Sequence, residues 1–128
     1  MKFSPALLWL LILGLLMSFS TPETACEATL SKEAFEQLLT EIEAKRYSKK
    51  KVSTAKSSIA GYCLSVAQAK AIVEQLPFES ARLDFASYAL EHLIDLEEIE
   101  VLYEPFLFSS SIEQLKARLN ELDDSSFR

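Results

Sequence analysis

Apolar residues recur at the spacing of α-helices through most of the chain. Four stretches place them at intervals of three and four residues, namely Phe35–Ile42, Ala69–Leu76, Ile99–Phe106 and Ile112–Leu122. This spacing gathers the apolar side chains on one face of a helix. No stretch sustains the two-residue alternation of a half-buried strand, so strands are not expected. The sequence therefore predicts an all-α fold.

Start and stop signals divide the pattern into six expected helices, at residues 32–44, 49–60, 66–76, 80–94, 96–104 and 111–122. Gly61 is expected to end the second helix in the left-handed conformation. Side chains that can accept a hydrogen bond from the first free amides of a helix precede or open five of the six helices: Ser31, Ser48, Ser65, Asp95 and Ser110. The last three of these also have a Gln or Glu three residues on, which completes a capping box.

A pattern of about 31 residues recurs along the chain. Tyr47, Phe78 and Phe108 lie 31 and 30 residues apart, and the apolar and capping positions after them repeat at the same spacing. Pairs of helices that repeat in this way stack, because one pair cannot bury its apolar face alone. We expect a compact stack of about six short helices built from roughly 31-residue helix-pair repeats. Residues 80–94 are apolar on two sides and are expected at its centre.

The N-terminus has the order of a secretory signal peptide. Lys2 precedes an apolar block from Ala6 to Met17, and the small residues Ser18 and Ser20 follow it. We expect cleavage after Ser20, and an uncleaved membrane anchor is the alternative. The expected organisation is a signal peptide at 1–20, an arm at 21–30, a helical domain at 31–122 and a tail at 123–128. The protein is expected to be secreted, or periplasmic or cell-surface in a bacterium.

The two cysteines suit an exported protein. Cys26 lies in the expected arm and Cys63 in a loop, and a disulfide between them would fix the arm to that loop. The alternative is two free thiols, with Cys63 as a small buried residue. The chain has no Cys-x-x-Cys pair, so nothing indicates a redox or zinc site.

Charge is distributed unevenly. The net charge of −6 argues against general nucleic-acid binding. The segment from Lys45 to Lys70 nevertheless carries seven basic residues and no acid, and the segment from Glu79 to Glu104 is strongly acidic. An acidic partner is expected to bind the basic segment through four lysines: Lys49, Lys50, Lys51 and Lys56. In the competing interpretation these lysines form a solvated surface or pair with the acidic segment.

Catalytic and cofactor chemistry has little support in the sequence. His92 is the only histidine, and Asp95 lies three residues on, where a carboxylate could orient a general base. Its neighbours on the same helical face are Phe85 and Ala89, which favours a packed core residue. Two glycines provide no phosphate-binding loop, and the acids near Glu97 lack the spacing of a calcium loop, so no cofactor or metal is expected.

The segment from about Glu33 to Leu119 resembles the family called domain of unknown function 4476. The resemblance rests on "FESARLDFASYALEHLIDLEEIEVLYEPFLFSSSIEQL" and on the preceding "LSVAQAKAIVEQLPF". Its marks are the pattern F-x3-RL-x2-A, the Asp at 95 and the Phe-x-Phe-Ser that begins at Phe106. The resemblance implies a helical domain that is often exported, and it supplies no reaction, cofactor or catalytic residue.

Together these observations predict a small secreted helical domain that acts as a non-enzymatic protein-interaction module. Its partner is expected to be another protein or an acidic extracellular molecule, with no nucleic acid and no membrane bound after signal cleavage. The alternative function is an enzyme with an unrecognised site around His92.

Overall fold

The computed structural model describes residues 26–126, and the predicted signal peptide and its cleavage position lie outside them. The described part is helical, as predicted. Its α-helices are α2 (Lys32–Ala44), α3 (Ser48–Ile59), α4 (Val66–Glu74), α5 (Glu79–Ala89), α6 (Glu100–Tyr103) and α7 (Ser109–Ser126). Two 3-10 turns, η1 (Leu90–His92) and η2 (Leu96–Glu98), and two short strands, β1 (Ala28–Thr29) and β2 (Tyr62–Cys63), complete it.

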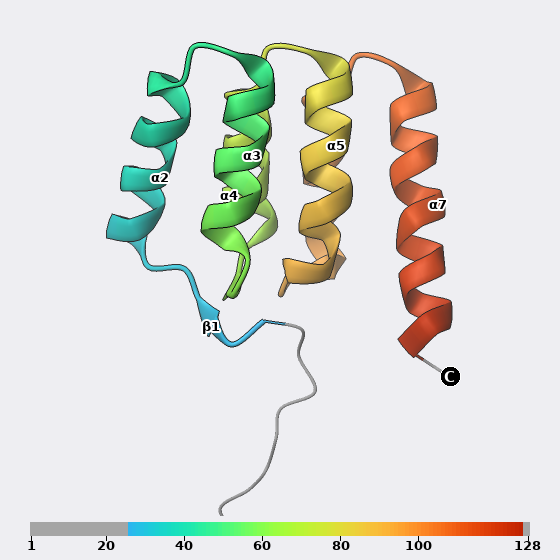
Figure 1. The fold of residues 1–128 in the computed structure, drawn as a ribbon. Coiled ribbons are helices and arrows are strands. Elements are labelled where there is room, and N and C mark those ends of the chain that lie inside the picture. The colour runs from blue at the N-terminus through green and yellow to red at the C-terminus, as the bar shows by residue number, and fades with distance from the viewer. Residues whose placement is uncertain (1–25, 127–128) are drawn as a thin grey trace, which may run out of the picture.

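The helices stand side by side with their connections at the two ends of the stack. Helices α2, α3, α5 and α7 form a row, and α4 lies behind α3 (Figure 1). The connections that lead into α3, α5 and α7 all lie at one end, the upper end in Figure 1, so these three helices run in the same direction. Strand β1 and the last turn of α7 lie at the opposite end.

Helix α5 occupies the centre of the domain, as its sequence predicts. It packs against α3, α4 and α7. Phe85, Ala86 and Ala89 are fully buried, and the small alanines allow the neighbouring helices to approach closely. The apolar pattern placed Leu83 on the central face, but this residue is only partly buried.

Two expected helices are shorter than predicted because the backbone forms a long-range pairing. Residues 80–94 were expected to be one helix, but α5 ends at Ala89 and Leu93 is extended. The amide of Leu64 donates to the carbonyl of His92 at 2.8 Å, and the amide of Ile94 donates to the carbonyl of Leu64 at 3.0 Å. The chain leaves the helix to form this bridge. It then makes only η2 and the four-residue α6 where one helix over 96–104 was expected.

The predicted helix starts are partly confirmed. The hydroxyl of Ser31 accepts the amide of Ala34, and the Ser65 capping box with Gln68 is complete. The other three predictions are wrong. Ser48 was expected to cap the second helix, but it is the first residue of α3. The capping position belongs to Tyr47, whose side chain makes no capping hydrogen bond. Helix α7 begins at Ser109, which places Ser110 inside its first turn.

The carboxylate of Asp95 does not cap its own turn. It accepts the amide of Val66 at 2.7 Å and so satisfies the first turn of α4, 29 residues earlier in the chain. The prediction for Gly61 is also wrong, because no residue of the described chain, glycine included, has a positive φ. Helix α7 continues to Ser126, beyond its expected end at residue 122.

A two-stranded parallel sheet, which the sequence did not predict, joins the N-terminal arm to the stack. Strand β1 pairs with β2 in the register Ala28 to Tyr62 and Thr29 to Cys63. Strands of two residues are too short to show alternation in a sequence. The predicted disulfide between Cys26 and Cys63 is present beside this sheet, and Leu30 is buried in the core.

The repeat of about 31 residues stays a prediction. Helices α3, α5 and α7 begin at Ser48, Glu79 and Ser109, and these starts have the expected spacing. The second members of the pairs differ, because α4 has nine residues whereas its counterpart is divided between η2 and α6.

We predict that Phe85→Ala strongly destabilises the domain. Phe85 is fully buried at the centre of the stack, and truncating a buried Phe costs about 3–5 kcal/mol of unfolding free energy because a cavity remains. Leu83→Ala, on the same helix but only partly buried, is the matched control and is expected to cost less than half as much. Urea denaturation followed by circular dichroism measures both. Equal transition midpoints for the two variants would contradict the central position of Phe85.

We also predict that the disulfide contributes substantially to stability. It joins residues with a sequence separation of 37. A cross-link of this span restricts the unfolded chain and raises the free energy of unfolding by roughly 3–4 kcal/mol. Cys26→Ser with Cys63→Ser is expected to lower the urea midpoint accordingly. A reductant should lower the midpoint of the wild-type protein to that of the variant and leave the variant unchanged. A wild-type midpoint that does not respond to complete reduction would refute the prediction.

Candidate functional site

Two of the four lysines predicted to bind an acidic partner are used within the fold. The ammonium of Lys51 donates to the carbonyls of Ile42 at 2.9 Å and Glu43 at 3.3 Å. These carbonyls lie at the C-terminal end of α2, where helix carbonyls lack intrahelical partners and a cation is favourable. Lys51 therefore caps α2 and joins it to α3.

Lys56 joins α3 to α5. Its ammonium lies 2.7 Å from a carboxylate oxygen of Asp84 and 5.6 Å from the centre of the Tyr88 ring. Lys70 makes a similar link from α4 to Glu104 at 2.6 Å. The hydrogen bond that Lys70 donates to Glu104 raises the pKa of Lys70, against a smaller opposing effect of desolvation. These contacts agree with the competing interpretation, in which the basic segment pairs with the acidic one.

The other two lysines remain available. Lys49 and Lys50 are exposed in the first turn of α3, and Lys45 and Arg46 are exposed immediately before it. None of these four side chains makes a hydrogen bond or an ion pair with any residue in the range 26–126. We call these four residues the basic corner. It lies at the upper end of the stack in Figure 1, between α2 and α3.

Large apolar side chains are exposed along the same end of the stack. Tyr47, Phe78, Leu107 and Phe108 are 65%, 61%, 81% and 59% exposed, respectively. They lie on the connections that enter α3, α5 and α7 (Figure 1). We call this row the aromatic edge. A surface on which several large apolar side chains are exposed together is a candidate site for contact with another molecule.

Two polar residues of α5 fix the backbone beneath the aromatic edge. The Glu79 carboxylate accepts the amide of Leu107 at 3.1 and 3.2 Å and that of Phe108 at 3.1 Å. The Arg82 guanidinium donates to the carbonyl of Leu76 at 2.8 Å and to that of Pro105 at 2.6 Å. These contacts fix the backbone of the connections that enter α5 and α7.

Hydrogen bonding controls the ionisation of Glu79. Partial burial raises its pKa, but the amides of Phe108 and Leu107, the hydroxyl of Ser111 and the charge of Arg82 together outweigh this effect. The pKa of Glu79 is consequently lower than its ordinary value, and the carboxylate stays ionised at neutral pH.

A shallow groove runs from the aromatic edge between α3 and α5. It encloses about 550 Å³, with Ser48, Lys49 and Val52 on one wall and Ser80, Ala81 and Asp84 on the other. Half of the residues that line it have small side chains: Ser48, Ser53, Ser80 and Ala81. Because Ser48 follows Tyr47 and Ser80 lies two residues after Phe78, the open end of the groove lies between these two exposed aromatic residues.

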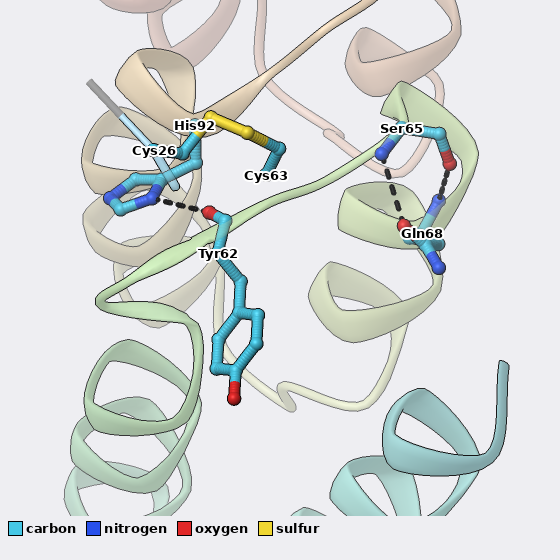
Figure 2. The surroundings of a disulfide bond; sticks show 6 residues. All are labelled: Cys26, Tyr62, Cys63, Ser65, Gln68 and His92. Atoms are coloured by element: carbon cyan, nitrogen blue, oxygen red, sulfur yellow. Dashed lines mark hydrogen bonds between the residues drawn. A yellow bond between two sulfur atoms is a disulfide. The ribbon is translucent and has the colours of Figure 1, made fainter. Parts of the chain in front are cut away.

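His92, the candidate general base, has a structural position. Its side chain is 7% exposed, and Nδ1 lies 2.9 Å from the carbonyl oxygen of Tyr62 (Figure 2). Its ring lies 5.1 Å from that of Tyr88, centre to centre. Asp95, the expected orienting carboxylate, instead binds the amide of Val66. The arrangement fixes the backbone next to Cys63, and the expected carboxylate of Asp95 is not a partner of the ring.

Metal binding and membrane insertion have no support within residues 26–126. No group of three or more His, Cys, Asp or Glu side chains there is placed to hold a metal ion. None of the helices in this range combines the length and apolar character needed to cross a bilayer.

The aromatic edge was not predicted, although the regular spacing of its aromatic residues is visible in the sequence. The recurrence of Tyr47, Phe78 and Phe108 was interpreted only as part of a packing repeat, whereas all three side chains are exposed. No comparable pattern points to Glu79 and Arg82, because their partners are backbone groups more than 20 residues away in three of the four contacts.

We predict that Glu79→Gln destabilises the domain in a pH-dependent way. Because folding lowers the pKa of Glu79, its stabilising effect is full above the unfolded value of about 4.3 and is lost as the pH falls through the folded value. The variant should unfold about 1 kcal/mol more easily at neutral pH, and the difference should shrink below about pH 4. Glu113→Gln, an exposed acid on α7, is the control. A constant difference at all pH values would contradict the ionised role of Glu79.

Comparison with known proteins identifies the family and adds no activity. No curated protein and no solved structure matches the chain significantly. Residues 29–119 match the family described as Domain of unknown function (DUF4476). This range covers the chain from β1 to the middle of α7, with the aromatic edge, the groove and His92 inside it. The protein belongs to the DUF4476 family.

Proposed function

We propose that this protein is an exported, non-enzymatic interaction domain that binds another protein through its aromatic edge. The observation that carries the proposal is the exposure of Tyr47, Phe78, Leu107 and Phe108 on a single end of the stack. Aromatic side chains are the commonest energetic centres of protein interfaces. The backbone of two of the three connections is held by Glu79 and Arg82, and a backbone that is ordered before binding loses less entropy when a partner arrives.

Two features support an exported location. The order of basic residue, apolar block and small residues at the N-terminus is typical of a secretory signal peptide. The disulfide between Cys26 and Cys63 is a bond that persists in oxidising compartments and is rare in the cytosol.

The position of His92 favours binding over catalysis. A general base needs access to substrate and a suitable partner group. Here Nδ1 of His92 is directed at the carbonyl of Tyr62. The carboxylate of Asp95 accepts the amide of Val66 and does not orient the histidine ring. The aromatic edge, in contrast, offers shape and apolar area but no nucleophile or acid–base pair.

The test compares capture by the intact protein and by two double variants. Phe78→Ser with Phe108→Ser removes the centre of the aromatic edge. Ile94→Ser with Leu96→Ser removes side chains that are 55% and 44% exposed near the opposite end of the stack, and is the matched control. Each protein is collected from the medium of an exporting host, immobilised and incubated with extracellular fluid from the source cells. Retained proteins are quantified by mass spectrometry.

The expected result is a set of partners that the wild-type protein and the control retain and that the edge variant loses by at least about tenfold. Circular dichroism establishes that all three proteins are folded. Retention of the same proteins in the same amounts by the edge variant would contradict the proposal. Wild-type protein that stays in the cytosol with Met1 intact would contradict export.

A further inference from the structure

We infer that the aromatic edge and the basic corner together bind an acidic peptide segment of the partner that also carries an aromatic side chain. The segment's carboxylates face Lys45, Arg46, Lys49 and Lys50, and its aromatic side chain enters the groove between α3 and α5. This inference rests on the proposed function and adds the chemistry of the partner.

Charge complementarity is the first argument. The four cations of the basic corner have no partner among the described residues, and no acid occurs between Ala44 and Val73 in the sequence. Lys51 and Lys56 are occupied by the α2 carbonyls and by Asp84. The cations that remain free are therefore those at the end of the stack, next to Tyr47.

The groove supplies the second argument. Its volume of about 550 Å³ lies in the range of sites that take a small ligand or a few side chains. The small side chains of Ser48, Ser80 and Ala81 in its walls leave room for a bulky partner side chain. Tyr47 and Phe78 flank its open end, where an aromatic ring can stack against them.

The geometry favours a peptide over a membrane surface. Free cations border only the Tyr47 end of the aromatic edge, whereas a flat anionic bilayer would meet the whole row. The groove also descends along α3 from Ser48 to Lys56, which is about 12 Å at 1.5 Å per residue. A chain can enter a groove of this kind, and a flat surface cannot.

The test uses a random copolymer of glutamate and tyrosine as the probe, with polyglutamate and vesicles of phosphatidylcholine and phosphatidylglycerol for comparison. Binding to the intact protein is measured by fluorescence anisotropy for the polymers and by cosedimentation for the vesicles. The copolymer is expected to bind more tightly than polyglutamate, to weaken as salt is raised, and to show no competition from vesicles.

Two variants separate charge from aromatic contact. Lys49→Gln with Lys50→Gln is expected to weaken copolymer binding about 3- to 10-fold. Lys32→Gln with Lys116→Gln, which removes the same charge elsewhere, is expected to leave it unchanged. Tyr47→Ser with Phe78→Ser should abolish the preference for the copolymer over polyglutamate.

Several outcomes would overturn the inference. The first is that the copolymer does not bind, and the second is that both lysine double variants weaken copolymer binding equally. The third is that vesicles bind instead of the copolymer. The fourth is salt-dependent self-association of the protein in sedimentation velocity. Its failure is distinguishable from that of the proposed function. If Phe78→Ser with Phe108→Ser removes the captured partners while Lys49→Gln with Lys50→Gln does not, the aromatic edge binds protein and only the acidic chemistry is wrong.

Discussion

Helix α5 has neighbours on three sides, and the positions of the other helices depend on how it meets them. Its apolar faces are made by Phe85 and by alanines that let α3, α4 and α7 approach. The polar residues of α5 lie off these faces and are exposed or partly exposed. Glu79 and Arg82 hold the connections at the upper end of the stack, and Asp84 holds Lys56 on α3. One helix thus provides both the centre of the core and the polar contacts that arrange its neighbours.

The parts of the fold that the sequence predicts correctly are those set by local interactions. The spacing of apolar residues and the Ser31 and Ser65 caps locate α2 and the start of α4, because each depends on residues within one or two turns. The end of α5 could not be predicted, since it depends on backbone hydrogen bonds to Leu64. Backbone pairing over such a distance leaves no residue pattern. The two-residue strands were missed for the same reason.

The candidate site shows the same division. The run of lysines is visible in the sequence, but only tertiary contacts separate Lys51 and Lys56, which join helices, from Lys49 and Lys50, which are free. The aromatic residues are equally ambiguous. Phe106 is buried and Phe108, two residues later, is exposed. Their chemistry is the same, and the turn that Glu79 and Arg82 hold directs one inward and the other outward.

The two ends of the stack differ in what they present. Strand β1 and the last turn of α7 lie at the end away from the aromatic edge (Figure 1). Polypeptide joined to either end of the described domain is therefore attached on the side away from the aromatic edge. A tether, an anchor or a second domain attached on that side would hold the protein upright with its aromatic edge facing outward. Such a domain can be displayed on a surface or placed within a longer chain without covering the aromatic edge.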